Sequence, residues 1–287
     1  MDSGRREEHG NRSPGSSSRE DRMAAVPKDA ASVILLRDAP FSSGVEVLMV
    51  RRHARSDFAG GMHVFPGGGV EECDCGQDAV GLCAGAGPEG AMSMVADAPS
   101  PARALGILVA GIRETFEETG ILLARDSAGE LVAYRGERAG RFAAWREAIR
   151  DGRLSFPEMI AGEGLELAVD HLVYFAHWIT PELSPIRFDT RFFLAPAPPH
   201  QDACHDAVET TAHLWITPQE ALERCEGGEF PMLPPTVANL MALARFSRVE
   251  EAVASTQGRD IQVVAPRVSF EGGRMRLLLP GDPGYAR

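Results

Sequence analysis

The 287-residue sequence lacks any apolar run of the roughly 18 residues that a membrane-spanning helix requires. Residues 1–28 are rich in Ser, Arg, Glu, Gly and Asp and hold no apolar segment of the kind found in a secretory signal. The C-terminal Tyr285-Ala286-Arg287 is not the tripeptide that directs proteins to peroxisomes. We therefore expect a cytoplasmic protein without a membrane partner, in which a disordered tail, 1–28, precedes one domain, 29–287.

Basic residues are also in the minority, since 29 Lys and Arg stand against 41 Asp and Glu, a net charge of −12. Proteins that coat nucleic acids need clustered Lys and Arg for the phosphates, so nucleic acid is not expected as a partner. A small anionic substrate would need local positive charge. A bound metal ion and the basic stretch 51–55 would supply it, although such a stretch is as often an ordinary polar strand end.

Cysteines number only five, too few for a disulfide scaffold in a chain of this length. Cys73, Cys75 and Cys83 lie close together in the sequence. A structural zinc site needs four ligands, and no second Cys or His pair with suitable spacing lies nearby, so we do not predict one.

Carboxylates, by contrast, are concentrated in one segment, because residues 113–121 read Arg-Glu-Thr-Phe-Glu-Glu-Thr-Gly-Ile. At about 100° per residue, Glu114, Glu117 and Glu118 share one sector of a helix. The opposite side is apolar: Leu105, Val109, Ile112 and Phe116. Like charges at i,i+4 destabilise a helix by roughly 0.2–0.5 kcal/mol per pair, whereas a hard divalent cation would make their proximity favourable. The cluster predicts a metal-binding face; the alternative is a solvated helix surface on which Arg113 pairs with Glu117.

A glycine run, Phe65-Pro66-Gly67-Gly68-Gly69, precedes this segment. We expect it to interrupt regular structure and to bring backbone carbonyls near the acidic face. Counting from Gly68, five residues lead to Asp74, and 38 residues (75–112) then precede Arg113. Together these segments resemble the Nudix box: a glycine, five residues, an acid, a spacer, and Arg-Glu-apolar-x-Glu-Glu-x-Gly-apolar. The sequence departs from it in having Asp74 in place of the usual Glu, and in a much longer spacer.

The interrupted box, the segment Arg187–Phe193 and the segment Trp215–Pro218 resemble the branch of the Nudix superfamily that contains peroxisomal coenzyme A diphosphatase. The resemblance covers most of residues 30–245 and implies an α/β fold: a Nudix-type α/β/α sandwich with a mixed sheet and additional helices. Residues 75–100 are rich in Gly, Ala, Pro and Asp and show little periodicity, so we expect a surface loop inserted in the box.

The resemblance also implies a metal site for Mg²⁺ or Mn²⁺. Glu117 and Glu118 would be direct ligands, and the carbonyl of Gly68 would supply another oxygen. Glu114 would be a ligand or the base that orients water. Asp74 would be an outer member of the metal shell, although its side chain is shorter than that of the usual glutamate.

Further residues have implied roles outside the metal shell. Arg113 would hold the carboxylates in place. One more acid would come from the loop before Trp-x-x-Pro, with Glu209 or Asp206 as the candidate. Of a four-residue signature for coenzyme A binding, two positions match, Arg52 and Gly61.

The activity implied is hydrolysis of a pyrophosphate linkage in a nucleotide derivative. Coenzyme A or acyl coenzyme A is favoured narrowly over ADP-ribose, NADH or a dinucleoside polyphosphate. A Nudix-like module that binds a nucleotide and regulates a partner without catalysis is the alternative from another class. The sequence leaves the oligomeric state open, with a homodimer among the options.

Periodicity and turn residues predict the order of elements. The helix that carries the box should begin at Pro101 and end at Gly120. Other helices are expected at 139–149, 157–168, after Thr217-Pro218, and at 235–246. Strands are expected at 31–36, 45–51, 62–65, 172–179, 187–194 and 214–216, with a C-terminal hairpin of 263–270 and 274–279.

Overall fold

The computed structural model describes residues 25–40, 43–83, 85–206, 208–272 and 274–285. Its centre is a mixed sheet in which β10, β7, β8, β1, β2 and β3 follow one another, while β4 pairs with β1 and β9 with β2. β1 is parallel to β8 and antiparallel to β2. The strands are β1 (Lys28–Asp38), β2 (Val45–Arg52), β3 (His63–Val64), β4 (Gly67–Gly69), β7 (Val173–Ile179), β8 (Phe188–Pro196), β9 (Thr210–Ile216) and β10 (Val263–Val264).

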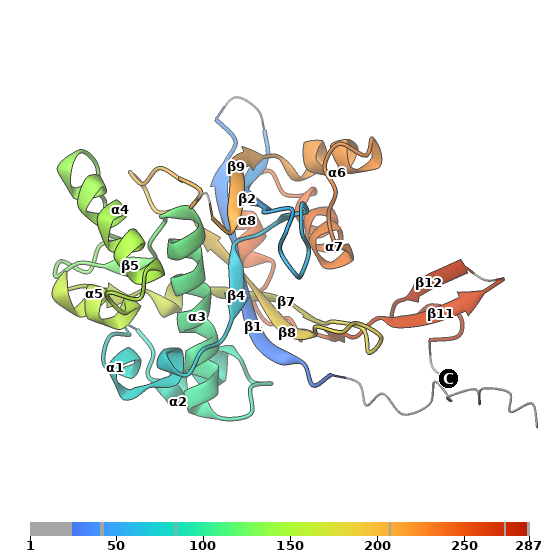
Figure 1. The fold of residues 1–287 in the computed structure, drawn as a ribbon, viewed down its shortest axis with the longest axis horizontal. Helices are drawn as coiled ribbons and strands as arrows, with labels where there is room; N and C mark the ends of the chain where they lie inside the picture. Colours follow the sequence, from blue (N-terminus) through green and yellow to red (C-terminus); the bar gives the residue numbers. More distant parts are fainter. Residues whose placement is uncertain (1–24, 41–42, 84, 207, 273, 286–287) are drawn as a thin grey trace, which may run out of the picture.

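Helices cover both faces of this sheet (Figure 1). Successive side chains of a strand point to opposite faces, so Val33 and Leu35 of β1 pack in one core and Ile34 and Leu36 in the other. The first core is closed by α1 (Gln77–Val80), α2 (Pro88–Met94), α3 (Pro101–Thr119), α4 (Glu137–Arg150) and α5 (Phe156–Gly162), and the second by α6 (Pro218–Glu226), α7 (Pro234–Leu243) and α8 (Val249–Ala254). The predicted α/β/α sandwich is confirmed.

The helix α3 has the predicted bounds because local signals fix both ends. The Ser100 hydroxyl accepts a hydrogen bond from the backbone N–H of Arg103, and Pro101 follows the cap. Gly120 ends the helix in the left-handed region, at φ 72°. Gly111 lets the helix approach β1, because a Cβ there would lie 3.2 Å from a methyl carbon of Val33.

The prediction of a surface loop at 75–100 is wrong, because this segment contains α1 and α2 and is part of the first core. Ala79, Ala91 and Val95 have no exposed surface. Asp97, which follows α2, forms an ion pair with the buried Arg191 of β8, at 2.9 Å. The helices are four and seven residues long, too short for a 3.6-residue hydrophobic period to show in the sequence.

The glycine run also differs from expectation, because Gly67–Gly69 form the strand β4. Gly67 pairs with Ser32 and Gly68 with Ala31 of β1. A Cβ at Gly67 would collide with the carbonyl oxygen of Ala31. Glycine is therefore required here by a close approach between strands, which a strand propensity scale does not register.

Other predictions need smaller corrections. The helix expected at 157–168 ends at Gly162, and Glu166–Leu167 form the strand β6, which pairs with β5 (Ala124–Arg125). The C-terminal strand expected at 263–270 is divided into β10 and β11 (Arg267–Glu271); β11 pairs with β12 (Arg274–Leu278). The predicted tail, 1–28, lies outside the described residues up to residue 24, and β1 begins at Lys28. No helix in the described part of the chain combines the length and hydrophobicity needed to cross a membrane.

Candidate active site

Glu118 is the most deeply buried carboxylate of the acidic face of α3, with 2% of its surface exposed. Its Oε2 accepts a hydrogen bond from the backbone N–H of Gly67, at 3.1 Å. Its Oε1 is buried without a hydrogen-bond partner, and the nearest cation is Arg52 Nη1 at 3.6 Å. Burial, followed by the nearby charge of Glu114, raises the pKa of Glu118 well above its usual range.

Glu114 lies against the glycine strand, because a Cβ at Gly68 would collide with its carboxyl group. Its Oε1 accepts a hydrogen bond from Arg113 Nη1 at 2.9 Å, and the same nitrogen lies 3.6 Å from Glu117 Oε1. Burial raises the pKa of Glu114 to about 7 and also raises the pKa of Glu117. The structure thus brings together Gly68 and all three glutamates of the predicted metal face.

Asp74 faces Arg113 rather than the glutamates. Its Oδ1 accepts a hydrogen bond from Arg113 Nε at 2.9 Å, and its Oδ2 accepts bonds from Arg113 Nη2 and from the backbone N–H of Glu71. Arg113 also donates to the carbonyl of Gly69, at 3.0 Å. Both oxygens of Asp74 are therefore engaged, and we interpret this residue as a support for Arg113 instead of a member of a metal shell.

The loop before β9 offers two acids, and the geometry distinguishes them. Asp206 accepts hydrogen bonds from the backbone N–H groups of Val208, Glu209 and Thr210. Burial alone would raise the pKa of Asp206, but these hydrogen bonds outweigh burial and lower it. Asp206 thus shapes the loop, whereas the Glu209 side chain lines the same cavities as Glu114 and Glu117.

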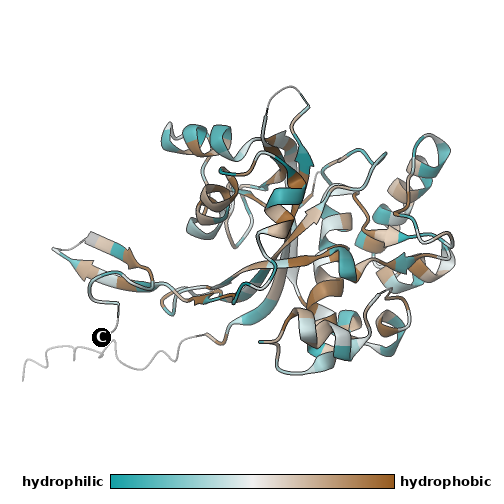
Figure 2. Ribbon diagram, turned by 180° about the vertical axis from the view of Figure 1, so that it is seen from behind, coloured by the Kyte–Doolittle hydropathy of each residue, from teal (hydrophilic) through white to brown (hydrophobic). Residues whose placement is uncertain are grey.

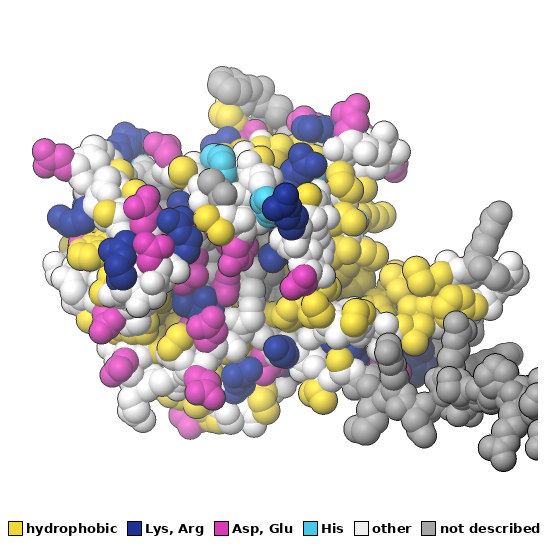
Figure 3. Space-filling model, in the orientation of Figure 1, with side chains coloured by type: hydrophobic (Ala, Val, Ile, Leu, Met, Phe, Trp, Pro, Cys, Tyr) yellow, Lys and Arg dark blue, Asp and Glu magenta, His cyan; other side chains and the backbone are white. Residues whose placement is uncertain are grey.

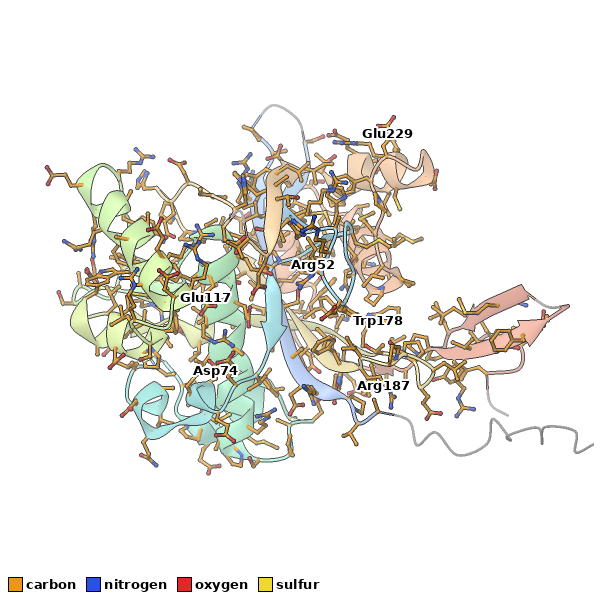
Figure 4. The ribbon with its side chains drawn as sticks, viewed as in Figure 1. Arg52, Asp74, Glu117, Trp178, Arg187 and Glu229 are labelled. Carbon is orange, nitrogen blue, oxygen red and sulfur yellow. The ribbon has the colours of Figure 1, made fainter. Side chains whose placement is uncertain are left out.

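The two residues of the coenzyme A signature have different positions. Arg52 lines the larger cavity beside Glu118. Gly61 lies in the turn after β2, at φ 75°, where its N–H donates to the carbonyl of Arg52. It does not line a described cavity and has a backbone role in this turn. In the view of Figure 4, Arg52 and Trp178 lie on one side of β4, and Asp74 and Glu117 on the other.

A cavity of about 720 Å³ opens beside the acidic face. Its charged lining residues all belong to the segments just described: Arg52, Glu71, Arg113, Glu114, Glu117 and Glu209. The lining from β7 and β8, the start of α7 and the C-terminal hairpin is uncharged and mostly apolar: Trp178, Ile179, Phe188, Leu233, Met275 and Leu277 are examples. A cavity of this size suits a ligand with one charged and one apolar part.

A second cavity, of about 180 Å³, shares Glu114, Glu117 and Glu209 with the first and adds Arg146 and Arg150 of α4. Arg146 donates to the carbonyl of Glu117 at 2.7 Å, and its Nη2 is buried without a hydrogen-bond partner. Sequence reasoning missed both arginines. Their i,i+4 spacing on a predicted helix would have placed them on one face, but not beside the glutamates.

The donor set suits a hard divalent cation, which prefers carboxylate and carbonyl oxygens. The buried, unpartnered Oε1 of Glu118 and the contact of Gly68 with Glu114 fit such an ion. In the described residues, no three His, Cys, Asp or Glu side chains are already arranged as a metal cage. Arg113 and Gly67 hold some of the carboxylate oxygens instead.

Comparisons with known proteins support the same reading of the chain. A sequence model described as the NUDT19 Nudix domain matches residues 24–243. The chain is 28% identical to the acyl-coenzyme A diphosphatase NUDT19 of Gallus gallus, over 90% of this chain and 79% of that protein. It is 27% identical to the protein of the same name from Homo sapiens, over 86% and 74%.

Among solved structures, the chain resembles a Nudix hydrolase from Alicyclobacillus acidocaldarius. The TM-score is 0.65 and the identity 27%, over 80% of this chain and 96% of that one. Residues 24–243, which match the sequence model, contain β4, α3 and the loop before β9, which carry the site. The chain therefore belongs to the NUDT19 Nudix domain family of the Nudix hydrolases.

Proposed function

We propose that this protein hydrolyses the pyrophosphate linkage of coenzyme A or acyl coenzyme A and that its activity depends on Mg²⁺ or Mn²⁺. The observation that carries the proposal is Oε1 of Glu118, which is buried without a hydrogen bond beside the Gly68–Glu114 contact. A buried carboxylate oxygen without a hydrogen bond is costly, and Arg52 Nη1, at 3.6 Å, compensates for it without donating one, so a bound cation would stabilise this oxygen further. The names of the relatives, acyl-coenzyme A diphosphatases, support the substrate class.

Glu117, Glu118 and the carbonyl of Gly68 would hold the cation, which neutralises phosphate oxygens and favours a nucleophile near neutral pH. Arg113 binds Oε1 of Glu114 and thereby orients its other oxygen. Glu114 Oε2 would then accept a proton from the attacking water. Arg52, next to Glu118, adds positive charge for the diphosphate.

The proposal is tested with Glu118→Gln, which keeps the shape of the side chain but removes its charge. We expect kcat for coenzyme A to fall by about 10²-fold or more, because charge stabilisation of the transition state is lost. In metal-free protein the thermal midpoint should stay the same or rise, because burial disfavours the charged form of this carboxyl. Glu223→Gln, on the exposed surface of α6, is the matched control and should retain wild-type activity.

Wild-type activity in Glu118→Gln would remove this residue from the catalytic set. The substrate panel is coenzyme A, acyl coenzyme A, ADP-ribose, NADH and a dinucleoside polyphosphate, each with Mg²⁺ and with Mn²⁺. Turnover restricted to ADP-ribose or NADH would contradict the proposed substrate class. No turnover of any of them would favour a nucleotide-binding regulatory module instead.

A further inference from the structure

The C-terminal hairpin of β11 and β12 has one apolar face. Phe270 pairs with Met275 and Val268 with Leu277, so these four side chains share a face. Phe270 and Met275 are 66% and 72% exposed. Brown and teal residues both occur along the hairpin in Figure 2, as this alternation requires. Because a two-stranded hairpin is only marginally stable in water, an apolar face of this kind calls for something that covers it.

This face continues the wall of the larger cavity, because Met275 and Leu277 line the cavity that also contains Glu114, Glu117 and Gly68. The hairpin projects from the body of the molecule in Figure 1, and hydrophobic side chains gather on it in Figure 3. It also lies beyond residues 24–243, the part of the chain that matches the family's sequence model. The active-site cavity therefore has an apolar extension that the family domain itself does not supply.

Charge is distributed unevenly around the substrate-sized space. No Lys, Arg, Asp or Glu from β7, β8, α7 or the hairpin lines the larger cavity, whereas the smaller cavity across the acidic cluster is lined by charges of both signs, among them Arg146 and Arg150. A phosphate placed against the uncharged wall would lose its hydration without a compensating cation. An aliphatic chain placed there would be stabilised, because its apolar surface would be removed from water.

We propose that the apolar face of the hairpin binds the acyl chain of an acyl coenzyme A substrate, with Met275 and Leu277 as specificity-determining residues. This inference rests on the proposed function. The diphosphate lies at the acidic cluster, the acyl-pantetheine arm extends toward the hairpin, and the phosphorylated nucleoside lies toward Arg146. Chain-length preference is thus set by a segment outside the matched family domain.

The direct test is the dependence of kcat/KM on chain length, with free, acetyl-, hexanoyl- and dodecanoyl-coenzyme A as substrates. Each buried methylene contributes a factor of up to roughly fourfold. We expect kcat/KM to rise along the series and then level off where the chain passes beyond the hairpin. Equal values for free and dodecanoyl-coenzyme A would overturn the assignment.

The residues are tested with Met275→Ser and Leu277→Ser. Each should lower kcat/KM for dodecanoyl-coenzyme A by about tenfold, while the value for free coenzyme A changes less than about twofold. Arg276→Ser, on the opposite face of the same strand, is the matched control and should leave both values unchanged. A merely structural hairpin would give equal losses for all substrates, and that result would overturn the inference.

The outcomes distinguish failure of the acyl-chain assignment from failure of the proposed hydrolysis of coenzyme A. Hydrolysis of free coenzyme A with no effect of chain length overturns the acyl assignment alone. If neither coenzyme A nor any thioester is hydrolysed, both proposals fail. Sedimentation of wild type and Met275→Ser tests the competing occupant, a second copy of the chain. A dimer that Met275→Ser dissociates, with equal loss for every substrate, would assign the face to self-association.

Discussion

At the scale of single residues, burial governs the acidic cluster more strongly than the charges around it. Glu114 and Glu117 both contact Arg113, yet the pKa of each is raised, because desolvation outweighs the attraction of the arginine. Arg113 is held by the two oxygens of Asp74 and is shared among its partners. It therefore orients the carboxylates without neutralising them fully, which leaves the site ready for a further cation.

This arrangement predicts how stability changes with pH. The pKa of Glu114 is about 7 in the folded protein, above the value of 4.5 for an ordinary glutamate. The folded state therefore binds more protons, and stability present below pH 4.5 is lost as pH rises through 7. The loss is up to about 3 kcal/mol for this one group. In metal-free protein the thermal midpoint should fall across this range.

Divalent cation should reverse that trend, because it binds the carboxylates in their charged form. The midpoint is measured with Mg²⁺ or Mn²⁺ and with EDTA at several pH values. We expect the stabilisation by metal to increase as pH rises, and to be much smaller in Glu118→Gln. A stabilisation that is the same at every pH would contradict the role of the glutamates as ligands.

At the scale of elements, the sequence predicts the ends of a helix best where capping residues fix them locally. The bounds of α3 follow from the Ser100 cap, Pro101 and Gly120. The strand β4 was missed because glycines signal a turn in isolation, and only the approach to Ala31 makes them a strand. The helices α1 and α2 were missed because their burial depends on contacts with α3, which no local pattern encodes.

The segment 75–100 therefore should behave as part of the core rather than as an appended loop. Val95→Ala removes two buried carbon atoms, and we expect it to lower the free energy of unfolding by about 1–3 kcal/mol. Ser93→Ala, at an exposed position nearby, should change it by less than about 0.5 kcal/mol. Chemical denaturation measures both. Equal stability of Val95→Ala and wild type would restore the loop interpretation.

At the scale of the whole molecule, the site is assembled from parts that are far apart in the chain. Glu209 reaches the glutamates of α3 from the loop before β9, and Arg146 and Arg150 reach them from α4. Glu209 could be identified from the sequence, because the family resemblance implies an acid in the loop before Trp-x-x-Pro. The arginines carry no such signal, since their position depends on how α4 packs across the end of α3.

Two cavities meet at one acidic cluster and give the molecule a direction: the larger continues to an apolar wall, whereas the smaller has mostly charged and polar surroundings beyond the cluster, among them Arg146 and Arg150. If the nucleoside half of coenzyme A occupies the smaller cavity, its 3′-phosphate should contact Arg150, the more exposed of the two arginines. Arg150→Gln should then raise KM for coenzyme A by about fivefold, the value of one exposed ion pair. KM for dephospho-coenzyme A, which lacks that phosphate, should not change.

The control is Arg153→Gln, which removes a nearby arginine that is more exposed than Arg150 and lines neither described cavity. It should leave KM for both substrates unchanged. This control distinguishes a general effect of net charge on an anionic substrate from a direct contact between Arg150 and the 3′-phosphate. Raising the salt concentration should reduce the difference between wild type and Arg150→Gln, because exposed charges are screened. If Arg150→Gln raised KM equally for coenzyme A and dephospho-coenzyme A, the 3′-phosphate would lie elsewhere and the proposed direction of the substrate would lose its support.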